Sequence, residues 1–206
     1  MEYKKLSQKE IISKYDSYAK YYNFAEIFMS LLLGKYRKKL LREVKGRVLE
    51  VGIGTGANLR YYSSECNVAG VDLSKEMLKI ARRNADKLGK NVTLRLGNAE
   101  KLPFGNKRFD YVVDTLGLCT YPNPIKALKE MKRVCKKNGR ILLLEHGISD
   151  YGFAAKFQKK REKKHYQKVG CSLLRDHFEL AGKAGLKIAR KERKLFGIIY
   201  VIIAKQ

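Results

Sequence analysis

Short apolar segments alternate with amphipathic segments through most of this 206-residue chain, and this alternation constrains the fold more than any other feature. Segments of this length that are nearly all apolar are typical of parallel strands buried on both faces of a sheet. We expect five such strands, at 47–51, 68–72, 93–97, 111–114 and 140–145. Helices are expected between them at 56–62, 74–88 and 123–136. Strands and helices in this order predict an α/β fold.

The two ends of the chain extend this pattern. Two amphipathic helices are expected at the N-terminal end, over 7–22 and 24–42. At the C-terminal end we expect a helix at 173–184, then strands at 186–191 and 195–204 joined by the basic stretch 191–194. The prediction is therefore a Rossmann-like, doubly wound, mostly parallel seven-stranded sheet with a C-terminal antiparallel hairpin and an N-terminal helical extension. We expect the extension over 1–46 and one α/β domain over 47–206.

The chain is strongly basic, with 45 Lys and Arg against 20 Asp and Glu and a net charge of +25. Such a charge attracts polyanions, including nucleic acid and anionic membrane. The segment from Lys156 to Lys168 mixes cations with aromatic residues, which is typical of interfacial helices and also of nucleic-acid binding. A solvated charged face or a lysine-rich proteome would explain it as well. We favour peripheral contact with an anionic membrane over nucleic acid as the partner.

The four cysteines, Cys66, Cys119, Cys135 and Cys171, are widely separated and do not show the spacing of zinc ligands. We expect reduced thiols and no metal. The N-terminus lacks the apolar run of a secretory signal, and the apolar segment 24–33 is shorter than the roughly 20 residues that span a bilayer. The expectation is a cytoplasmic protein that is soluble or lies on a membrane surface.

The first expected strand leads directly into a glycine-rich turn, VLEVGIGTG at 48–56. Alternating glycines allow a tight turn and the close approach of a ligand to the backbone. Asp72 ends the next strand, where a carboxylate can accept hydrogen bonds from ribose hydroxyls. The glycine pattern alone also suits a simple turn or a dinucleotide such as NAD, because Ala57 occupies a position that the dinucleotide fingerprint tolerates.

Five motifs in sequence order resemble those of the class I S-adenosylmethionine-dependent methyltransferases, and the resemblance covers nearly all of 47–204. They are LEVGIGTG at 49–56, GVDLSKEML at 70–78, GNAEKLPF at 97–104, FDYVV at 109–113 and the segment 128–140. The resemblance implies S-adenosylmethionine as the cofactor and a small-molecule substrate. Asn98 stands where the family usually has Asp, so an acceptor for the adenine amino group is kept while the charge is lost. The cofactor-binding residues that the resemblance implies are Glu50, Gly52, Gly54, Thr55, Gly56, Asp72, Leu73, Met77, Asn98, Ala99 and Thr115.

Two groups within this class share further motifs with the chain. The segment YDSYAKYYN at 15–23 is similar to the lid of the ubiquinone/menaquinone C-methyltransferases. TLGLC at 115–119, LEH at 144–146 and GCSL at 170–173 resemble the lipid-droplet and endoplasmic-reticulum thiol S-methyltransferases, which match somewhat better. Phospholipid amine methyltransferases are similar to this chain in size and general sequence character. These resemblances imply a lipophilic acceptor, whether a thiol, a quinone ring or a phospholipid amine.

Two residues are candidates for a direct part in methyl transfer, which requires alignment and the removal of any proton from the acceptor. His146 follows a buried strand, and its ordinary pKa suits proton transfer near neutrality. Tyr22 belongs to a stripe with Tyr15 and Tyr18 that can close over the site. A hydrogen bond to a loop and ordinary packing are the structural alternatives.

Two other functions stay open at this point. RNA methylation would use the basic surface, but the N-P-P-[YF] tetrapeptide of the amino-group nucleic-acid methylases is replaced by DTLG at 114–117. A non-catalytic basic binding protein would not need the intact glycine loop or Asp72.

Overall fold

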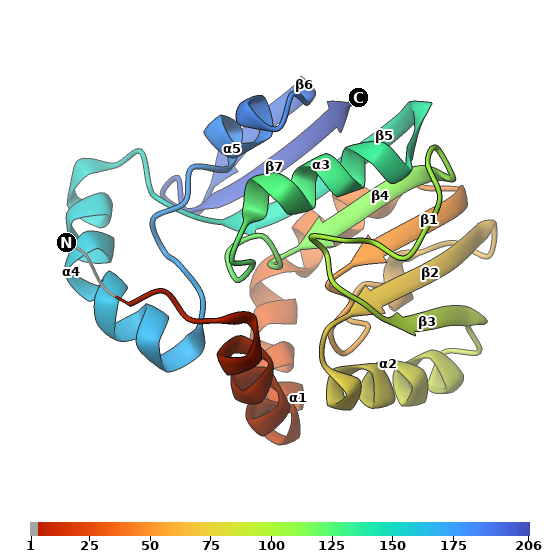
Figure 1. Cartoon of the computed structure of the whole chain (residues 1–206), viewed down its shortest axis with the longest axis horizontal. Helices are drawn as coiled ribbons and strands as arrows, with labels where there is room; N and C mark the ends of the chain where they lie inside the picture. Colours follow the sequence, from red (N-terminus) through yellow and green to blue (C-terminus); the bar gives the residue numbers. More distant parts are fainter. Residues whose placement is uncertain (1–3) are drawn as a thin grey trace.

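The computed structural model describes residues 4–206, except for the side chains of residues 18–30. A seven-stranded sheet forms its centre, with the strand order β3-β2-β1-β4-β5-β7-β6 (Figure 1). The strands are β1 (Gly46–Val51), β2 (Cys66–Asp72), β3 (Val92–Leu96), β4 (Phe109–Thr115), β5 (Cys135–His146), β6 (Lys187–Lys194) and β7 (Ile199–Lys205). The first five are parallel, and β7 runs antiparallel to both of its neighbours. The predicted mostly parallel sheet with a C-terminal antiparallel hairpin is confirmed.

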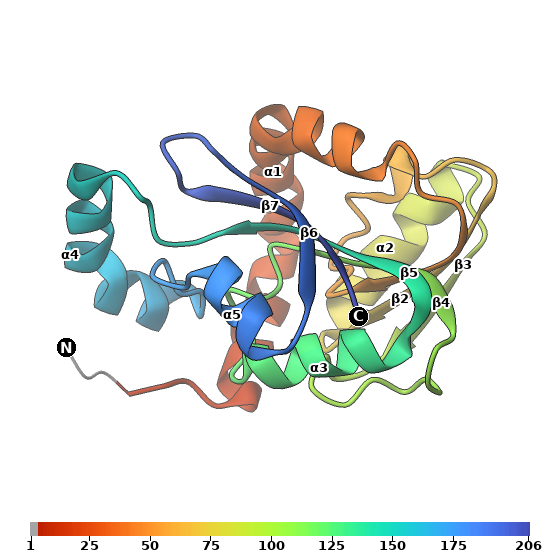
Figure 2. The ribbon, with the colours of Figure 1, turned by 90° about the horizontal axis from the view of Figure 1, so that it is seen from above.

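Helices cover both faces of this sheet. They are α1 (Gln8–Leu41), α2 (Lys75–Lys87), α3 (Pro124–Val134), α4 (Gly152–Val169) and α5 (His177–Lys183), with a 3-10 turn η1 at Leu59–Tyr61. Figure 2 shows α1 on one side of the sheet and α3 with α5 on the other. Across residues 4–206, no helix combines the length with the apolar composition that crossing a membrane requires.

Three of the expected helices are different in the structure. The separate helices expected at 7–22 and 24–42 are one continuous helix, α1, which begins with the capping box of Ser7 and Glu10. The helix expected at 56–62 is reduced to η1. The C-terminal part of α1, with Leu33 and Leu41, packs in the same cluster as Leu59 of η1. Because α1 already covers this face, a full helix after β1 has no apolar surface left to bury.

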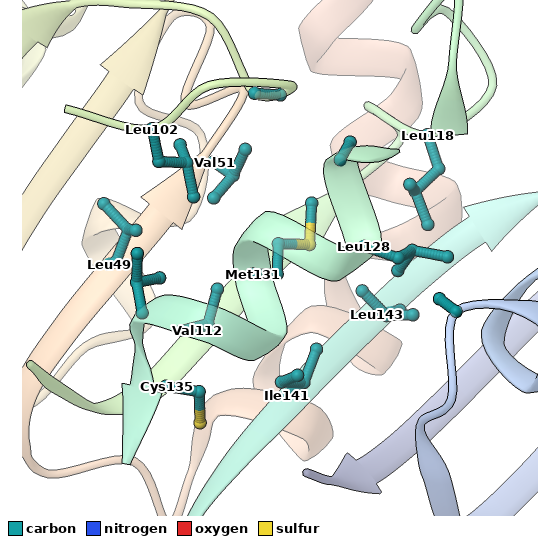
Figure 3. Packing of buried hydrophobic residues seen from close by; sticks show 14 of the residues in the cluster. Leu49, Val51, Leu102, Val112, Leu118, Leu128, Met131, Cys135, Ile141 and Leu143 are labelled. Atoms are coloured by element: carbon teal, nitrogen blue, oxygen red, sulfur yellow. The ribbon is translucent and has the colours of Figure 1, made fainter. Parts of the chain in front are cut away.

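The main core lies between the sheet and the helices α3 and α5. Figure 3 shows Leu128 and Met131 of α3 packed against residues of β1, β4 and β5, among them Leu49, Val112 and Leu143. All five of these side chains are fully buried. This core fixes the strands firmly, so the loops at their carboxyl ends start from well-defined positions.

The C-terminal elements differ from the expectation in their bounds. The stretch 191–194 belongs to β6, and the turn before β7 contains Leu195 and Phe196 at φ 49° and 54°, followed by Gly197 at φ 71°. The helix expected from residue 173 begins at His177, because the Asp176 side chain accepts hydrogen bonds from the amides of Phe178 and Glu179. The preceding residues therefore form a loop.

Candidate active site

A cleft of about 770 Å³, its open mouth included, lies at the carboxyl ends of β1, β2 and β4. The strand order reverses between β1 and β4, and ligands of doubly wound sheets bind at such a point. Helix α1 contributes one wall of the cleft. The lining residues are Gln8, Ile11, Ile12, Tyr15, Gly52, Gly54, Val71, Asp72, Leu73, Ser74, Met77, Gly97, Ala99, Thr115, Leu116, Gly117, Thr120, Tyr121 and Pro122.

The glycine loop forms the floor of the cleft. Gly52 and Gly54 have φ values of 63° and 54°, a conformation that other residues rarely adopt. A Cβ atom on Gly52 would lie 2.6 Å from the Tyr121 hydroxyl oxygen. A Cβ atom on Gly54 would have no neighbour nearer than the Gly52 carbonyl oxygen, at 4.0 Å. The space above Gly54 is therefore open to a ligand that approaches the backbone.

Asp72 ends β2 and faces this loop. Its Oδ2 accepts a hydrogen bond from the Gly54 amide at 2.8 Å, and its Oδ1 accepts one from the Ser74 amide at 2.9 Å. Burial raises the pKa of this carboxyl, while the backbone donors at Ser74 and Gly54 oppose the shift. A carboxylate oxygen can accept more than one hydrogen bond, so Asp72 keeps acceptor capacity for a pair of hydroxyl groups.

The N-terminal part of α1 closes one side of the cleft. Ile11, Ile12 and Tyr15 line the wall, and the Ser74 hydroxyl donates a hydrogen bond to Asp16 Oδ1. Ser74 also caps α2, because its Oγ accepts a hydrogen bond from the Met77 amide at 3.0 Å. The Ser74 side chain therefore connects α1 to the start of α2.

A buried polar network supports the loop from below. The Arg37 guanidinium donates to Asn58 Oδ1 at 2.8 Å, and Asn58 Nδ2 donates to Glu50 Oε1 at 2.8 Å and to Thr115 Oγ1 at 3.0 Å. The Tyr62 hydroxyl donates to Glu50 Oε2 at 2.9 Å. Burial raises the pKa of Glu50 to about 7. Both Glu50 oxygens are thus engaged within the protein.

The sequence-predicted cofactor residues fall into two sets. Seven of them line the cleft, namely Gly52, Gly54, Asp72, Leu73, Met77, Ala99 and Thr115. Four are not among the lining residues, namely Glu50, Thr55, Gly56 and Asn98. The Asn98 side-chain oxygen accepts a hydrogen bond from the Glu100 amide at 2.7 Å. Tyr22, the second candidate for catalysis, lies outside the described side chains, as does Tyr18.

Sequence reasoning missed a buried pair of carboxyl groups, Asp114 and Glu145. The Gly117 amide donates to Asp114 Oδ1 at 3.0 Å and to Glu145 Oε1 at 3.2 Å, and the Tyr121 hydroxyl donates to Asp114 Oδ2 at 2.8 Å. Burial raises the pKa of Asp114 to about 6 and that of Glu145 well above its usual range. The two carboxyls lie directly behind Tyr121 and Gly117 of the cleft wall, where burial disfavours the ionisation of both. The sequence signal that could have revealed this pair is an acidic residue near the end of each of two strands, β4 and β5, that lie side by side.

His146 does not reach the cleft wall. Its Nε2 lies 2.8 Å from Cys171 Sγ, and Cys119 completes the group. The pKa of His146 is raised, because the interaction with Cys119 outweighs the burial that opposes it. His146 is not among the residues that line the cleft, so the structure gives no support to its predicted role as a general base.

An open glycine loop, a buried acid at the end of the second strand and a cleft at the point of strand reversal agree with the resemblance of the sequence to the class I S-adenosylmethionine-dependent methyltransferases. Residues 49–143 match the family model described as "Methyltransferase domain". The chain carries a methyltransferase domain, and its cofactor is S-adenosylmethionine.

Relatives and structures of known proteins agree with this class. The mitochondrial methyltransferase OMS1 of Saccharomyces cerevisiae is 31% identical over 85% of this chain and 41% of its own length. Phosphatidylethanolamine N-methyltransferase of Cereibacter sphaeroides is 40% identical over 55% of this chain and 57% of its own length. The chain thus spans about half the length of these relatives. Demethylmenaquinone methyltransferase of Staphylococcus aureus is 36% identical over 53% of this chain and 48% of its own length.

The fold has a close counterpart among solved structures. A methyltransferase of Haloferax volcanii, solved in complex with the Trm112 activator, superposes with a TM-score of 0.76 at 16% identity. The match covers 95% of this chain and 96% of that one. At this identity the likeness concerns the fold.

The cleft fits the cofactor. Asp72 would bind the ribose hydroxyls, the loop at Gly52 and Gly54 would hold the methionine part, and Met77 with Ala99 offers an apolar wall to the adenine. S-adenosylmethionine supplies an activated methyl group when it is bound. The protein's contribution is to hold this group and the acceptor at near-attack distance in a cleft that α1 partly shields from water.

Proposed function

We propose that the protein transfers a methyl group from S-adenosylmethionine to a small lipophilic acceptor that it takes from an anionic membrane surface. This makes it a cytoplasmic protein peripheral to the membrane. The observation that carries the proposal is an exposed aromatic cluster beside a cationic helix, connected to the helix that lines the cleft.

The aromatic cluster consists of Tyr151, Phe153, Phe157 and Phe196, which we call the aromatic tip. Tyr151, Phe153 and Phe196 meet edge to face, with ring centroids 6.3, 6.4 and 6.5 Å apart. The side chains of Phe153 and Phe196 are 70% and 67% exposed, and Phe157 is 59% exposed. Aromatic rings gathered in contact with water are typical of a surface that enters the boundary between lipid headgroups and acyl chains.

Cations surround the aromatic tip along α4. Its exposed basic residues are Lys156, Lys159, Lys160, Arg161, Lys163, Lys164 and Lys168. The one acidic residue of this helix, Glu162, is buried and accepts hydrogen bonds from Ser172 and Leu173. Each cation near an anionic bilayer contributes about 1 kcal/mol of attraction. The exposed charged side chains of helix α4 are therefore all positive, next to the aromatic tip.

Helix α4 also contacts the segment that leads into the cleft wall. Tyr166 packs with Leu6 and Ile11, and Gln167 donates a hydrogen bond to the Lys4 carbonyl at 2.7 Å. Ile11 belongs to the cleft lining as well. Figure 1 shows α4 beside the N-terminal segment at one end of the molecule. Helix α4 thus links the aromatic tip, which lies at its N-terminal end, to the first part of α1, which contacts its C-terminal end.

The names of the relatives support a lipophilic acceptor. One is a phosphatidylethanolamine N-methyltransferase and another a demethylmenaquinone methyltransferase, and both names denote membrane lipids. The thiol motifs at 115–119, 144–146 and 170–173 leave a hydrophobic thiol as a third acceptor.

Flotation with vesicles tests the membrane contact, comparing phosphatidylglycerol with phosphatidylcholine. We expect the protein to float with the anionic vesicles and to lose this binding at high salt. The variant Phe153→Ser with Phe196→Asn should lose it too, since Asn tolerates the positive φ of position 196. Leu88→Ser, which removes an exposed apolar side chain at the end of α2, should float like the wild type.

Label transfer tests the acceptor class. The protein is incubated with methyl-labelled S-adenosylmethionine and a cell extract, and organic-soluble material is separated from acid-precipitated polymer. Label in the organic phase is the expected result. Label in nuclease-sensitive polymer would replace the lipophilic acceptor by RNA and make α4 a phosphate-binding surface.

A further inference from the structure

Three side chains from separate parts of the sequence meet behind the cleft wall. Cys119 lies in the loop after β4, His146 ends β5, and Cys171 lies in the loop after α4. Their sulfur and nitrogen atoms all lie within 4.8 Å of one another, and His146 Nε2 is 2.8 Å from Cys171 Sγ. Cys119 and Cys171 are buried, and neither forms a disulfide.

This donor set suits zinc. Two thiolates and one imidazole are typical zinc ligands, whereas Mg²⁺ and Ca²⁺ prefer oxygen. Zinc–sulfur and zinc–nitrogen bonds of about 2.3 and 2.0 Å place tetrahedral ligand atoms about 3.6 Å apart. His146 Nε2 and Cys171 Sγ are 2.8 Å apart, so these two atoms would move apart by roughly 1 Å to admit the ion. Two thiolates would also neutralise a divalent ion, which favours its burial.

The segments that carry the ligands are held together by other contacts. The Ser172 amide donates to the Cys119 carbonyl at 2.9 Å. Arg175 donates to the carbonyls of Leu118 and Tyr121, on either side of Cys119. Buried Glu162 holds the loop just after Cys171 by accepting from the Ser172 hydroxyl at 2.7 Å. The three ligands are therefore positioned by the fold without a covalent link between them.

We propose that Cys119, His146 and Cys171 bind one Zn²⁺ ion whose fourth coordination position is open to a thiol ligand. Zinc sites with three protein ligands keep a fourth position for water or substrate. The loop that carries Cys119 also contributes Leu116, Gly117 and Thr120 to the cleft lining. The ion would thus lie next to the place where an acceptor binds. The thiol part of this proposal rests on the proposed function, while the metal site does not.

Cobalt substitution tests the metal site directly. The protein is purified under reducing conditions, freed of metal with a chelator and titrated with Co²⁺, and zinc is measured in the untreated protein. We expect one equivalent of metal, with the sulfur-to-cobalt charge-transfer and visible bands of a tetrahedral thiolate site. Cys119→Ser, Cys171→Ser and His146→Ala should each weaken Co²⁺ binding at least tenfold. Cys66→Ser removes a cysteine outside the group and should bind Co²⁺ like the wild type.

Two controls keep the test decisive. Circular dichroism and S-adenosylmethionine binding by each variant show that the domain is folded, so a lost cobalt spectrum then reports on the ligand. Absence of stoichiometric Co²⁺ and Zn²⁺ binding by the folded wild type would overturn the metal site. A Cys119–Cys171 disulfide in the freshly purified protein, found by mass spectrometry without reductant, would overturn it as well.

The thiol ligand is tested on the Co²⁺ form with 2-mercaptoethanol, a thiol with one sulfur. A stronger charge-transfer band with the metal retained is expected, and an unchanged spectrum would overturn the thiol part. If the wild type did not bind S-adenosylmethionine at all, that result would contradict the proposed function. Failure of the thiol proposal and failure of the proposed function are therefore distinguishable.

Discussion

The Gly54 amide donates a hydrogen bond to Asp72 Oδ2 at 2.8 Å, which joins the glycine loop after β1 to the end of β2. The same carboxylate accepts from the Ser74 amide at the start of α2. The loop that would hold the methionine part of the cofactor and the acid that would hold its ribose are therefore parts of one hydrogen-bonded unit. A change at either residue should affect both ends of the cofactor.

Substitution of Asp72 should weaken cofactor binding strongly. Asp72→Ala removes the acceptor for two backbone amides and for the ribose, and hydrogen bonds to a charged group contribute about 1.5–3 kcal/mol each. We expect affinity for S-adenosylmethionine to fall about 100-fold or more, as measured by calorimetry. Asp72→Asn keeps one acceptor oxygen and should lose less. Wild-type affinity in both variants would mean that the cofactor binds elsewhere.

Gly54→Ala should block the cleft through the added methyl group. The Cβ atom would occupy the open space above the loop, and φ of 54° adds strain of about 1 kcal/mol. We expect S-adenosylmethionine affinity to fall at least about tenfold. Gly89→Ala is the matched control, because Gly89 has a φ of 61° with nothing within 4 Å of its Cβ position. Both variants should lose a similar amount of stability, because both positions have a positive φ. Equal S-adenosylmethionine affinities of the two variants would therefore contradict the binding of the cofactor above Gly54.

Asp16→Ala should make the cofactor leave faster. Asp16 joins α1 to Ser74, and without this contact the cleft wall formed by Ile12 and Tyr15 is held less firmly. We expect the dissociation rate of S-adenosylmethionine, followed by stopped-flow fluorescence, to rise about 3- to 10-fold, which corresponds to about 1 kcal/mol. Lys9→Ala, at an exposed position of the same helix, should leave the rate unchanged. Equal rates for both variants would mean that α1 does not retain the cofactor.

Glu50→Gln should change how stability depends on pH. The pKa of Glu50 rises from 4.5 to about 7 on folding, so the folded state binds a proton more tightly than the unfolded state does. Ionisation of Glu50 then lowers the free energy of unfolding of the wild type as pH rises from about 4.5 to 7, by about 3 kcal/mol. The Gln variant lacks this loss.

Urea unfolding of both proteins across that pH range measures the difference. The variant should gain stability relative to the wild type as pH rises, and the gain should level off above pH 7. Parallel curves would show that Glu50 stays ionised throughout, paired with Arg37 through Asn58.

Most of the sheet could be predicted from the sequence, because its inner parallel strands are nearly all apolar and are separated by segments of helical periodicity. The expected burial of β3 on both faces was wrong, since β3 lies at the edge of the sheet and only its Val92 is buried. The turn η1 could not, since the helix missing after β1 depends on α1 covering that face from a distant part of the chain. The single helix α1 was also missed, because the one residue between the two expected helices is Asn23, a residue type that favours turns and helix ends.

The cofactor residues at Gly52, Gly54 and Asp72 were accessible because their motifs are local and continuous. The group of Cys119, His146 and Cys171 was not, since no spacing rule connects residues that meet only through the strand order. The position of Glu50 illustrates a further limit: its motif predicts proximity to the loop, and only the structure shows that Asn58 and Tyr62 occupy both of its oxygens.

Calorimetric titration of the wild-type protein with S-adenosylmethionine, repeated with NAD, tests directly whether the cleft binds the methyl donor. We predict one site for S-adenosylmethionine, competition by S-adenosylhomocysteine, and no binding of NAD. Binding of NAD in place of S-adenosylmethionine, or heat of binding from neither, would contradict the assignment of the cleft.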